Sequence, residues 1–171
     1  MKRDGVCYSK EEYVRKKYKE SAKVFINAYG WFVKEAQHIV PKPEGAEYPY
    51  WAFTDLYNVD QTGDGHVLTL DVPIGEAILF DMFDWTKIMQ MHYIGENESE
   101  EATFSEKLKN MGMNEFQIMT SNFYPEQKAR IQESWKRLFG HQQAIEAGDN
   151  SGVHSVQAGL WCIKDEWIVK E

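Results

Sequence analysis

One segment of this chain has the residue types and spacing of a metal site. The segment 60–65 (DQTGDG) places oxygen ligands at the first, third and fifth positions of a calcium loop and Gly65 at the sixth, and Asp71 falls at the twelfth. The residues that follow, 66–73, have instead the composition of a β-strand closed by a proline, whereas an EF-hand loop leads into a helix. We therefore predict a plain turn at 60–65, a strand at 66–73 and no metal site.

The densest local charge lies within 95–101, where Glu96, Glu98, Glu100 and Glu101 fall close together. The whole chain has 19 Lys and Arg against 27 Asp and Glu, a formal net charge of -8. Such a chain repels a phosphate backbone, so we expect no direct binding to nucleic acid. An acidic surface can instead occupy a basic groove of another protein. We interpret 95–101 as a solvated acidic loop and its glutamates as partner-binding residues; the alternative is that they only favour solubility.

A second candidate site combines aromatic rings with an amide. Tyr50, Trp51 and Gln157 have the chemistry to line a cleft in which a nicotinamide or adenine ring is stacked and hydrogen-bonded. The same aromatic residues are equally suited to a hydrophobic core, where Trp and Tyr contribute large buried areas. Both interpretations remain open at the level of the sequence.

Signatures of the common enzyme classes are absent from the sequence. It contains no Gly-rich phosphate loop, no His-Glu-x-x-His, no Cys-x-x-Cys and no Gly-x-Ser-x-Gly. Pairs such as His66 with Asp71, or His154 with Gln157, are of a kind that arises by chance in most proteins. We therefore expect no cofactor and favour binding over catalysis.

Composition favours one compact domain over the whole chain, 1–171. The 171 residues are 43% hydrophobic and 14% aromatic, enough to form a core without disulfides or metal. Cys7 and Cys162 lie at opposite ends of the sequence and are interpreted as ordinary thiols. No apolar run is long enough to span a bilayer, and no apolar signal core follows the N-terminus, so we expect a cytoplasmic protein with no membrane contact.

Periodicity predicts a long first helix and several later ones. Ser9 and Glu12 fit a capping box, and apolar residues three or four positions apart continue from there to about Ile39, before Pro41 and Pro43. Further helices are predicted at 82–93, capped by Asp81, and at 102–111, 114–120 and 125–139, the last ended by Gly140.

Strands are predicted at 48–53, 66–73, 77–80 and 153–163, with 167–169 extending the same sheet. Together with the helices they predict an α+β fold: a single domain with a small, mostly antiparallel sheet packed by the long N-terminal helix and several further helices.

Six short blocks follow one another in a fixed order: Ala28-Tyr29-Gly30-Trp31, Tyr48-Pro49-Tyr50-Trp51-Ala52, Leu70-Asp71-Val72-Pro73, Leu79-Phe80-Asp81-Met82-Phe83-Asp84, Glu133-Ser134-Trp135 and Val156-Gln157-Ala158. Through them the chain resembles, from about residue 25 to 171, the bacterial family catalogued as domain of unknown function 3841 (DUF3841). The resemblance implies a bacterial cytoplasmic protein whose relatives have no established activity. Relatives usually begin with a strand that carries a Trp and a Gln before the position of Gly5, and they tend to have a Glu where this chain has Cys162.

The resemblance leaves two functional hypotheses. The first is a non-catalytic acidic protein that inhibits a nucleic-acid-processing enzyme, similar to the anti-CRISPR inhibitors of Cas9 found on phages and mobile elements. The alternative is a divergent, NAD-using enzyme similar to ADP-ribosyltransferases, with its cleft near Tyr50, Trp51 and Gln157. The two departures from the family pattern weaken the second hypothesis, since they affect the nucleotide-binding strand and the candidate acidic residue.

Overall fold

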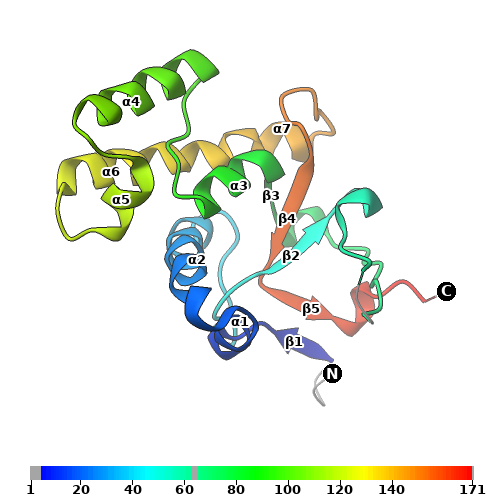
Figure 1. Ribbon diagram of the computed structural model, residues 1–171. Helices are drawn as coiled ribbons and strands as arrows, with labels where there is room; N and C mark the ends of the chain where they lie inside the picture. Colours follow the sequence, from blue (N-terminus) through cyan, green and yellow to red (C-terminus); the bar gives the residue numbers. More distant parts are fainter. Residues whose placement is uncertain (1–4, 63–64, 171) are drawn as a thin grey trace.

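The computed structural model describes residues 5–62 and 65–170, which fold into an α+β domain of two small antiparallel sheets and surrounding helices (Figure 1). The larger sheet has the order β2-β4-β3, formed by β2 (Tyr50–Phe53), β4 (Val156–Leu160) and β3 (Ala77–Asp81). The smaller sheet pairs β1 (Val6–Tyr8) with β5 (Cys162–Lys164). The predicted fold class, a small antiparallel sheet arrangement with a long N-terminal helix, is confirmed.

That N-terminal helical run consists of α1 (Glu11–Tyr18), one 3-10 turn (Lys19–Ser21) and α2 (Ala22–Ala36). The predicted capping box at its start is wrong. Lys10 occupies the N-cap position without a side-chain cap, and the backbone N–H of Glu11 donates instead to the Glu47 carboxylate at 2.9 Å. Ser9 is buried in a β-bridge with Tyr48 and is therefore not placed as a cap.

The pleat of the larger sheet separates its side chains into two cores. Register pairs Trp51 with Gly159 and Phe80 with Gln157, so these residues share the face that packs on the helices. The opposite face, which includes Leu79 and Leu160, forms a second and smaller cluster; its buried members are Ala77, Leu79, Ile145, Val156, Ala158 and Leu160.

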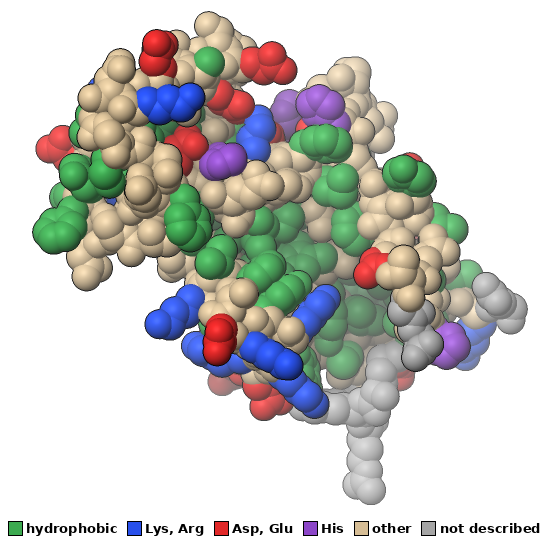
Figure 2. Space-filling model, viewed as in Figure 1, with side chains coloured by type: hydrophobic (Ala, Val, Ile, Leu, Met, Phe, Trp, Pro, Cys, Tyr) green, Lys and Arg blue, Asp and Glu red, His purple; other side chains and the backbone are tan. Residues whose placement is uncertain are grey.

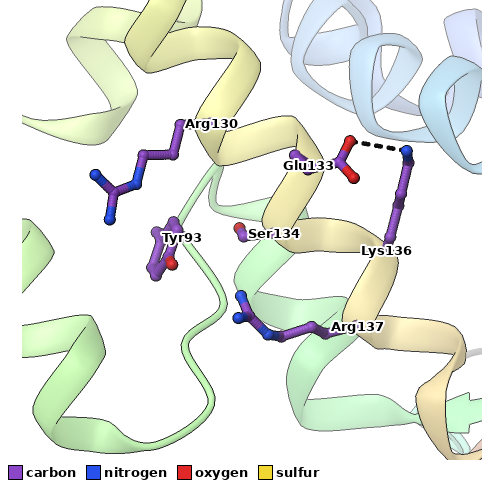
Figure 3. Close-up of a pocket in the computed structure, with 6 residues that line it drawn as sticks. All are labelled: Tyr93, Arg130, Glu133, Ser134, Lys136 and Arg137. Atoms are coloured by element: carbon purple, nitrogen blue, oxygen red, sulfur yellow. Dashed lines mark ion pairs between the residues drawn. The ribbon is translucent and has the colours of Figure 1, made fainter.

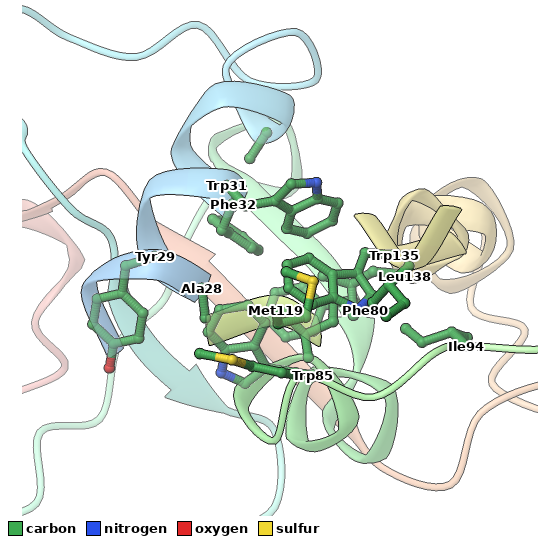
Figure 4. Close-up of a cluster of buried hydrophobic side chains, with 14 of the residues drawn as sticks. Ala28, Tyr29, Trp31, Phe32, Phe80, Trp85, Ile94, Met119, Trp135 and Leu138 are labelled. Atoms are coloured by element: carbon green, nitrogen blue, oxygen red, sulfur yellow. The ribbon is translucent and has the colours of Figure 1, made fainter. Parts of the chain in front are cut away.

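The main core is dominated by aromatic side chains from distant parts of the chain. Phe32 of α2 is fully buried, with its ring 5.5 Å from that of Phe80 and 5.3 Å from that of Trp85. Figure 4 shows Trp31 facing Trp135 of the last helical run, and their ring centroids are 5.4 Å apart. These edge-to-face contacts, typical of packed aromatic clusters, hold α2 between the sheet and the later helices.

Two of the predicted strands differ from the structure. The predicted strand 66–73 forms only one bridge, Leu70 with Ile168, and Val67 and Leu68 are about half exposed. Residues 66–73 have no neighbouring strand among the described residues to pair with along their length. Because β-strands need such pairing, a strand-like composition alone does not form one here. The predicted strand 153–163 divides at Trp161 into β4 and β5, which belong to different sheets, and 165–167 forms a 3-10 turn. The predicted turn at 60–65 includes residues 63–64, which lie outside the described residues.

The later helices begin and end at other residues than predicted. They are α3 (Met82–Met89), α4 (Glu98–Asn110), α5 (Glu115–Thr120) and α6 (Pro125–Ser134), followed without a break by a 3-10 segment (Trp135–His141) and α7 (Gln142–Glu146). The predicted stop at Gly140 is wrong, because the helical run continues through it. The interpretation of 95–101 as a loop is also wrong, since its last four residues form the first turn of α4.

Candidate functional site

The acidic segment 95–101 lies beside a pocket between the α3–α4 connection and the last helical run, which consists of α6, the 3-10 segment and α7. The pocket has a volume of about 550 Å³. Its lining residues come from this connection, from α6 and from the 3-10 segment that follows: Tyr93, Arg130, Glu133, Ser134, Lys136 and Arg137 (Figure 3). Acidic and basic side chains therefore meet at one place on the molecule.

The turn that carries the four glutamates is rigidly built. Asn97 caps α4, its side chain accepting a hydrogen bond from the Glu100 backbone N–H at 3.0 Å. Gly95 stands so close to this turn that an added Cβ would lie 2.7 Å from Cγ of Glu101 and 2.8 Å from the Asn97 carbonyl oxygen. Only glycine fits there without displacing the turn.

Two of the predicted site residues, Glu100 and Glu101, are used inside the protein. Glu100 accepts hydrogen bonds from the Glu96 N–H and from the Tyr93 hydroxyl, both at 2.7 Å, and these bonds lower the pKa of its carboxyl. Glu101 accepts from the Gly95 N–H at 3.0 Å and forms an ion pair with Lys87 at 2.7 Å. Their contacts fix the shape of the turn.

The other two, Glu96 and Glu98, face the solvent. The Glu96 side chain is 76% exposed, and its nearest cation, Arg137, lies 3.4 Å away. Glu98 is exposed and forms no ion pair with any residue that the structure describes. Figure 2 shows acidic side chains gathered over the part of the molecule where α4 lies. Of the four glutamates, Glu100 and Glu101 therefore stabilise the turn, and Glu96 and Glu98 are exposed to solvent.

The opposite wall of the site is basic. The Arg130 guanidinium lies over the stacked rings of Tyr93 and Phe104, at 5.9 and 5.1 Å from their centroids. Arg137 donates to the Ile94 carbonyl at 2.8 Å, and Lys136 pairs with Glu133 at 2.7 Å. The sequence analysis did not predict these cations as site residues. Their spacing places them along one helical run, but only the structure shows that Tyr93 lies next to them.

The second predicted site, the cleft of Tyr50, Trp51 and Gln157, is not assembled. Tyr50 lies on the face of the smaller cluster, whereas Trp51 and Gln157 lie on the helix-covered face. The Tyr50 hydroxyl is 3.1 Å from Cys7 Sγ, and burial together with this thiol raises the pKa of Tyr50. Trp51 Nε1 and Gln157 Oε1 are buried without a hydrogen-bond partner among the described residues. The structure therefore brings Trp51 and Gln157 to one face of the sheet and places Tyr50 on the other.

His154 has a different partner in the structure from the one considered in the sequence. His154 Nδ1 lies 2.9 Å from Oδ2 of Asp81, not beside Gln157. Asp81 is buried and caps α3 as predicted, accepting from the Phe83 N–H at 3.0 Å. The His154 side chain is 74% exposed, with its ring 4.9 Å from that of Phe83. Ser155 follows His154 directly, and its hydroxyl accepts a hydrogen bond from the Asn58 side chain at 2.7 Å. The contacts of Asp81 with His154 and with the Phe83 N–H tie the start of α3 to the beginning of β4.

Neither a metal site nor a membrane-spanning helix is found in the part of the chain that the structure describes. Residues 5–62 and 65–170 contain no group of three or more His, Cys, Asp or Glu side chains placed to share a metal ion. Within the same part of the chain, no helix combines the length and the apolar character needed to cross a membrane.

Comparison with known proteins identifies a family. The family model for a domain of unknown function, DUF3841, matches residues 1–169 and so includes β1 and α1, which precede the region of resemblance that starts at about residue 25. No curated protein and no solved structure gives a significant match.

Proposed function

Because the chain belongs to the DUF3841 family, whose function is unknown, its role has to be inferred from its site, and we propose that it is a non-catalytic binding protein. In this proposal Glu96 and Glu98 enter an Arg- and Lys-lined groove of a nucleic-acid-processing enzyme, where they replace phosphate groups. A guide-loaded Cas9-type nuclease is the first candidate partner, since such enzymes hold nucleic acid in positively charged channels.

The observation that carries the proposal is the ordered presentation of two exposed carboxylates, Glu98 without an ion pair among the described residues and Glu96 with one contact, to Arg137 at 3.4 Å. Glu96 and Glu98 flank the Asn97 cap, and the turn below them is held by hydrogen bonds to Glu100 and Glu101. A binding element that is already ordered loses little conformational entropy when it docks, so it binds more tightly than the same charges on a flexible loop.

Electrostatics supports the same class of partner. The net charge of -8 favours encounter with a basic surface and disfavours encounter with free nucleic acid. Rim charges of this kind act mainly on the rate of association, and salt screens them over about 8 to 10 Å at ordinary ionic strength. Binding is therefore expected to weaken as the salt concentration rises.

A direct test compares three forms of the full chain by biolayer interferometry on purified, guide-loaded Cas9. The test variant is Glu96→Gln with Glu98→Gln. The control variant, Glu12→Gln with Glu20→Gln, removes the same number of charges from exposed positions at the N-terminal helical run. Glu100 and Glu101 are left unchanged because their loss would alter the turn itself.

We expect the test variant to bind about tenfold more weakly than the unchanged protein, and the control variant to bind nearly as well. The difference should shrink between about 50 and 300 mM salt, as charge screening removes the advantage of the unchanged protein. Equal loss in both variants would mean that only net charge matters, and full binding by the test variant would exclude Glu96 and Glu98 from the interface. The absence of any binding would exclude Cas9 as the partner.

A further inference from the structure

A pocket with a basic rim is unexpected in a protein of net charge -8. Arg130, Ser134 and Arg137 are spaced four and three residues apart, so they lie along one side of the helical run from α6 into the 3-10 segment. Figure 3 shows Tyr93 between Arg130 and Arg137, with both guanidinium groups extending to its side of the helix. The pocket therefore has an aromatic floor with a cation near each end.

Arg130 is held in place by aromatic rings but has unused hydrogen-bond donors. Its guanidinium makes no hydrogen bond or ion pair with any residue that the structure describes, and it is positioned by its contacts with the rings of Tyr93 and Phe104. Stacking on a ring uses the face of the guanidinium and leaves its N–H edges free as donors. An oriented group with unused donors is suited to recognise an anion.

The other cations are held where a ligand can reach them. Arg137 is fixed by its hydrogen bond to the Ile94 carbonyl, while its carboxylate contacts, with Glu96 and Glu100, are longer at 3.4 and 3.8 Å. Lys136 forms an exposed pair with Glu133, of the kind that contributes little and exchanges readily. Glu133 is the one carboxylate among the six lining residues.

We propose that this pocket binds a small ligand with two linked phosphate groups. Its volume of about 550 Å³ lies within the range of small-molecule sites. The planar fork of an arginine matches the geometry of phosphate oxygens. Arg130 and Arg137 lie seven residues apart on the same side of the helical run, so each guanidinium can contact one of two linked phosphate groups. This proposal does not rest on the proposed function, although the Glu96 carboxylate contacts Arg137 at 3.4 Å.

The experiment is isothermal titration of the full chain with inorganic pyrophosphate, and with succinate as a dianion that lacks phosphorus. Arg130→Gln is the test variant, because Arg130 is exposed and we expect its replacement to leave the fold intact. Lys16→Gln, an exposed position in α1, is the control for the loss of one positive charge. Amide shifts of Tyr93 and Arg137 in a ¹H–¹⁵N spectrum report whether the ligand occupies this pocket.

We expect pyrophosphate to bind with a Kd below about 1 mM, with shifts at Tyr93 and Arg137. Arg130→Gln should weaken binding about tenfold or more, whereas Lys16→Gln should not. No saturable binding up to about 10 mM would overturn the proposal. So would equal affinity for succinate, equal loss in the two variants, or shifts confined to other parts of the protein. None of these results depends on the behaviour of Glu96 or Glu98 toward a partner.

Discussion

Gly159, in the central strand β4, shows how closely the helices approach the sheet. A Cβ at this position would lie 2.9 Å from the Phe32 ring, which is fully buried and has no room to move. We expect Gly159→Ala to lower the free energy of unfolding by about 1 to 3 kcal/mol, the usual cost of overpacking a core. Urea denaturation measures this difference.

Gly30→Ala is the matched control, since an added Cβ there meets nothing within 4 Å and Gly30 is exposed within α2. This change should raise the free energy of unfolding by about 0.5 to 1 kcal/mol, because Ala favours a helix over Gly. If Gly159→Ala were as stable as the unchanged protein, the close packing of Phe32 against β4 would be wrong.

Asp81 makes stability depend on acid pH. Burial alone would raise the pKa of its carboxyl, but hydrogen bonds from the N–H groups of His154, Phe83 and Ser155 and from the His154 ring outweigh burial and lower this pKa. A carboxyl whose pKa is lower in the folded state stabilises the protein above its unfolded pKa, about 3.9. This stabilisation is lost as the pH falls from about 4 through the folded value.

We therefore expect Asp81→Asn to be less stable than the unchanged protein by about 1 kcal/mol at pH 7, and the difference to narrow below about pH 4. Urea midpoints measured from about pH 7 to pH 3 test this. Asp55→Asn, a change at the exposed cap of a 3-10 turn, should have a smaller effect at pH 7. A difference for Asp81→Asn that stays constant over this range would contradict the assignment.

The residue types in the sequence indicated which chemistry a side chain could perform, but not where the fold would place that side chain. Tyr50, Trp51 and Gln157 suited a nucleotide cleft by type, yet neighbouring strand residues point to opposite faces, so Tyr50 and Trp51 separate. That signal was already present in the predicted strand 48–53. The pairing of His154 with Asp81, in contrast, depends on β3 lying beside β4, which no local pattern indicates.

Among the elements, α4 is the one on which the proposed interface depends. Asn97→Ala removes the side-chain acceptor for the Glu100 N–H and should lower the free energy of unfolding by about 0.5 to 2 kcal/mol. It should also increase hydrogen exchange in the first turn of α4. Asn97→Asp keeps an acceptor at the cap, so exchange there should stay slow. Equal exchange in Asn97→Ala and the unchanged protein would show that the cap does not order the turn.

Helix positions were predicted better than helix ends. The regions of α3, α5 and α6 follow from apolar periodicity and from Asp81, Asn114 and Pro125 at their starts. The acidic run hid the start of α4, although Asn97 stands one residue before it and acidic residues favour a first turn. Gly140 suggested a stop, but a glycine ends a helix only where its backbone turns left-handed, and this one continues the run.

Across the whole molecule, charge is distributed unevenly. Figure 2 shows acidic side chains over α4 and a cluster of basic side chains at the opposite end, where α1 lies. The last turn of α1 carries Arg15, Lys16 and Lys17. Under the proposed function, this separation of charge would turn α4 toward a basic partner. The -8 net charge alone gives attraction without orientation.

The α+β class was predictable from the alternation of helical and strand patterns, but the sheet order was not. The order β2-β4-β3 places the C-terminal β4 between two earlier strands, and such long-range pairing leaves no trace in local periodicity. The division into two sheets occurs at Trp161, whose buried Nε1 donates to the Val40 carbonyl at 2.7 Å. That contact joins residues 121 positions apart in the sequence.

The central claim is that the acidic turn occupies a groove that otherwise holds nucleic acid. Its most direct test is a competition between this protein and duplex target DNA for guide-loaded Cas9, followed by fluorescence anisotropy of labelled DNA. We expect the protein to displace the DNA, and Glu96→Gln with Glu98→Gln to require about tenfold more protein for the same displacement. Simultaneous binding of both to Cas9, or displacement unaffected by these two changes, would contradict the claim.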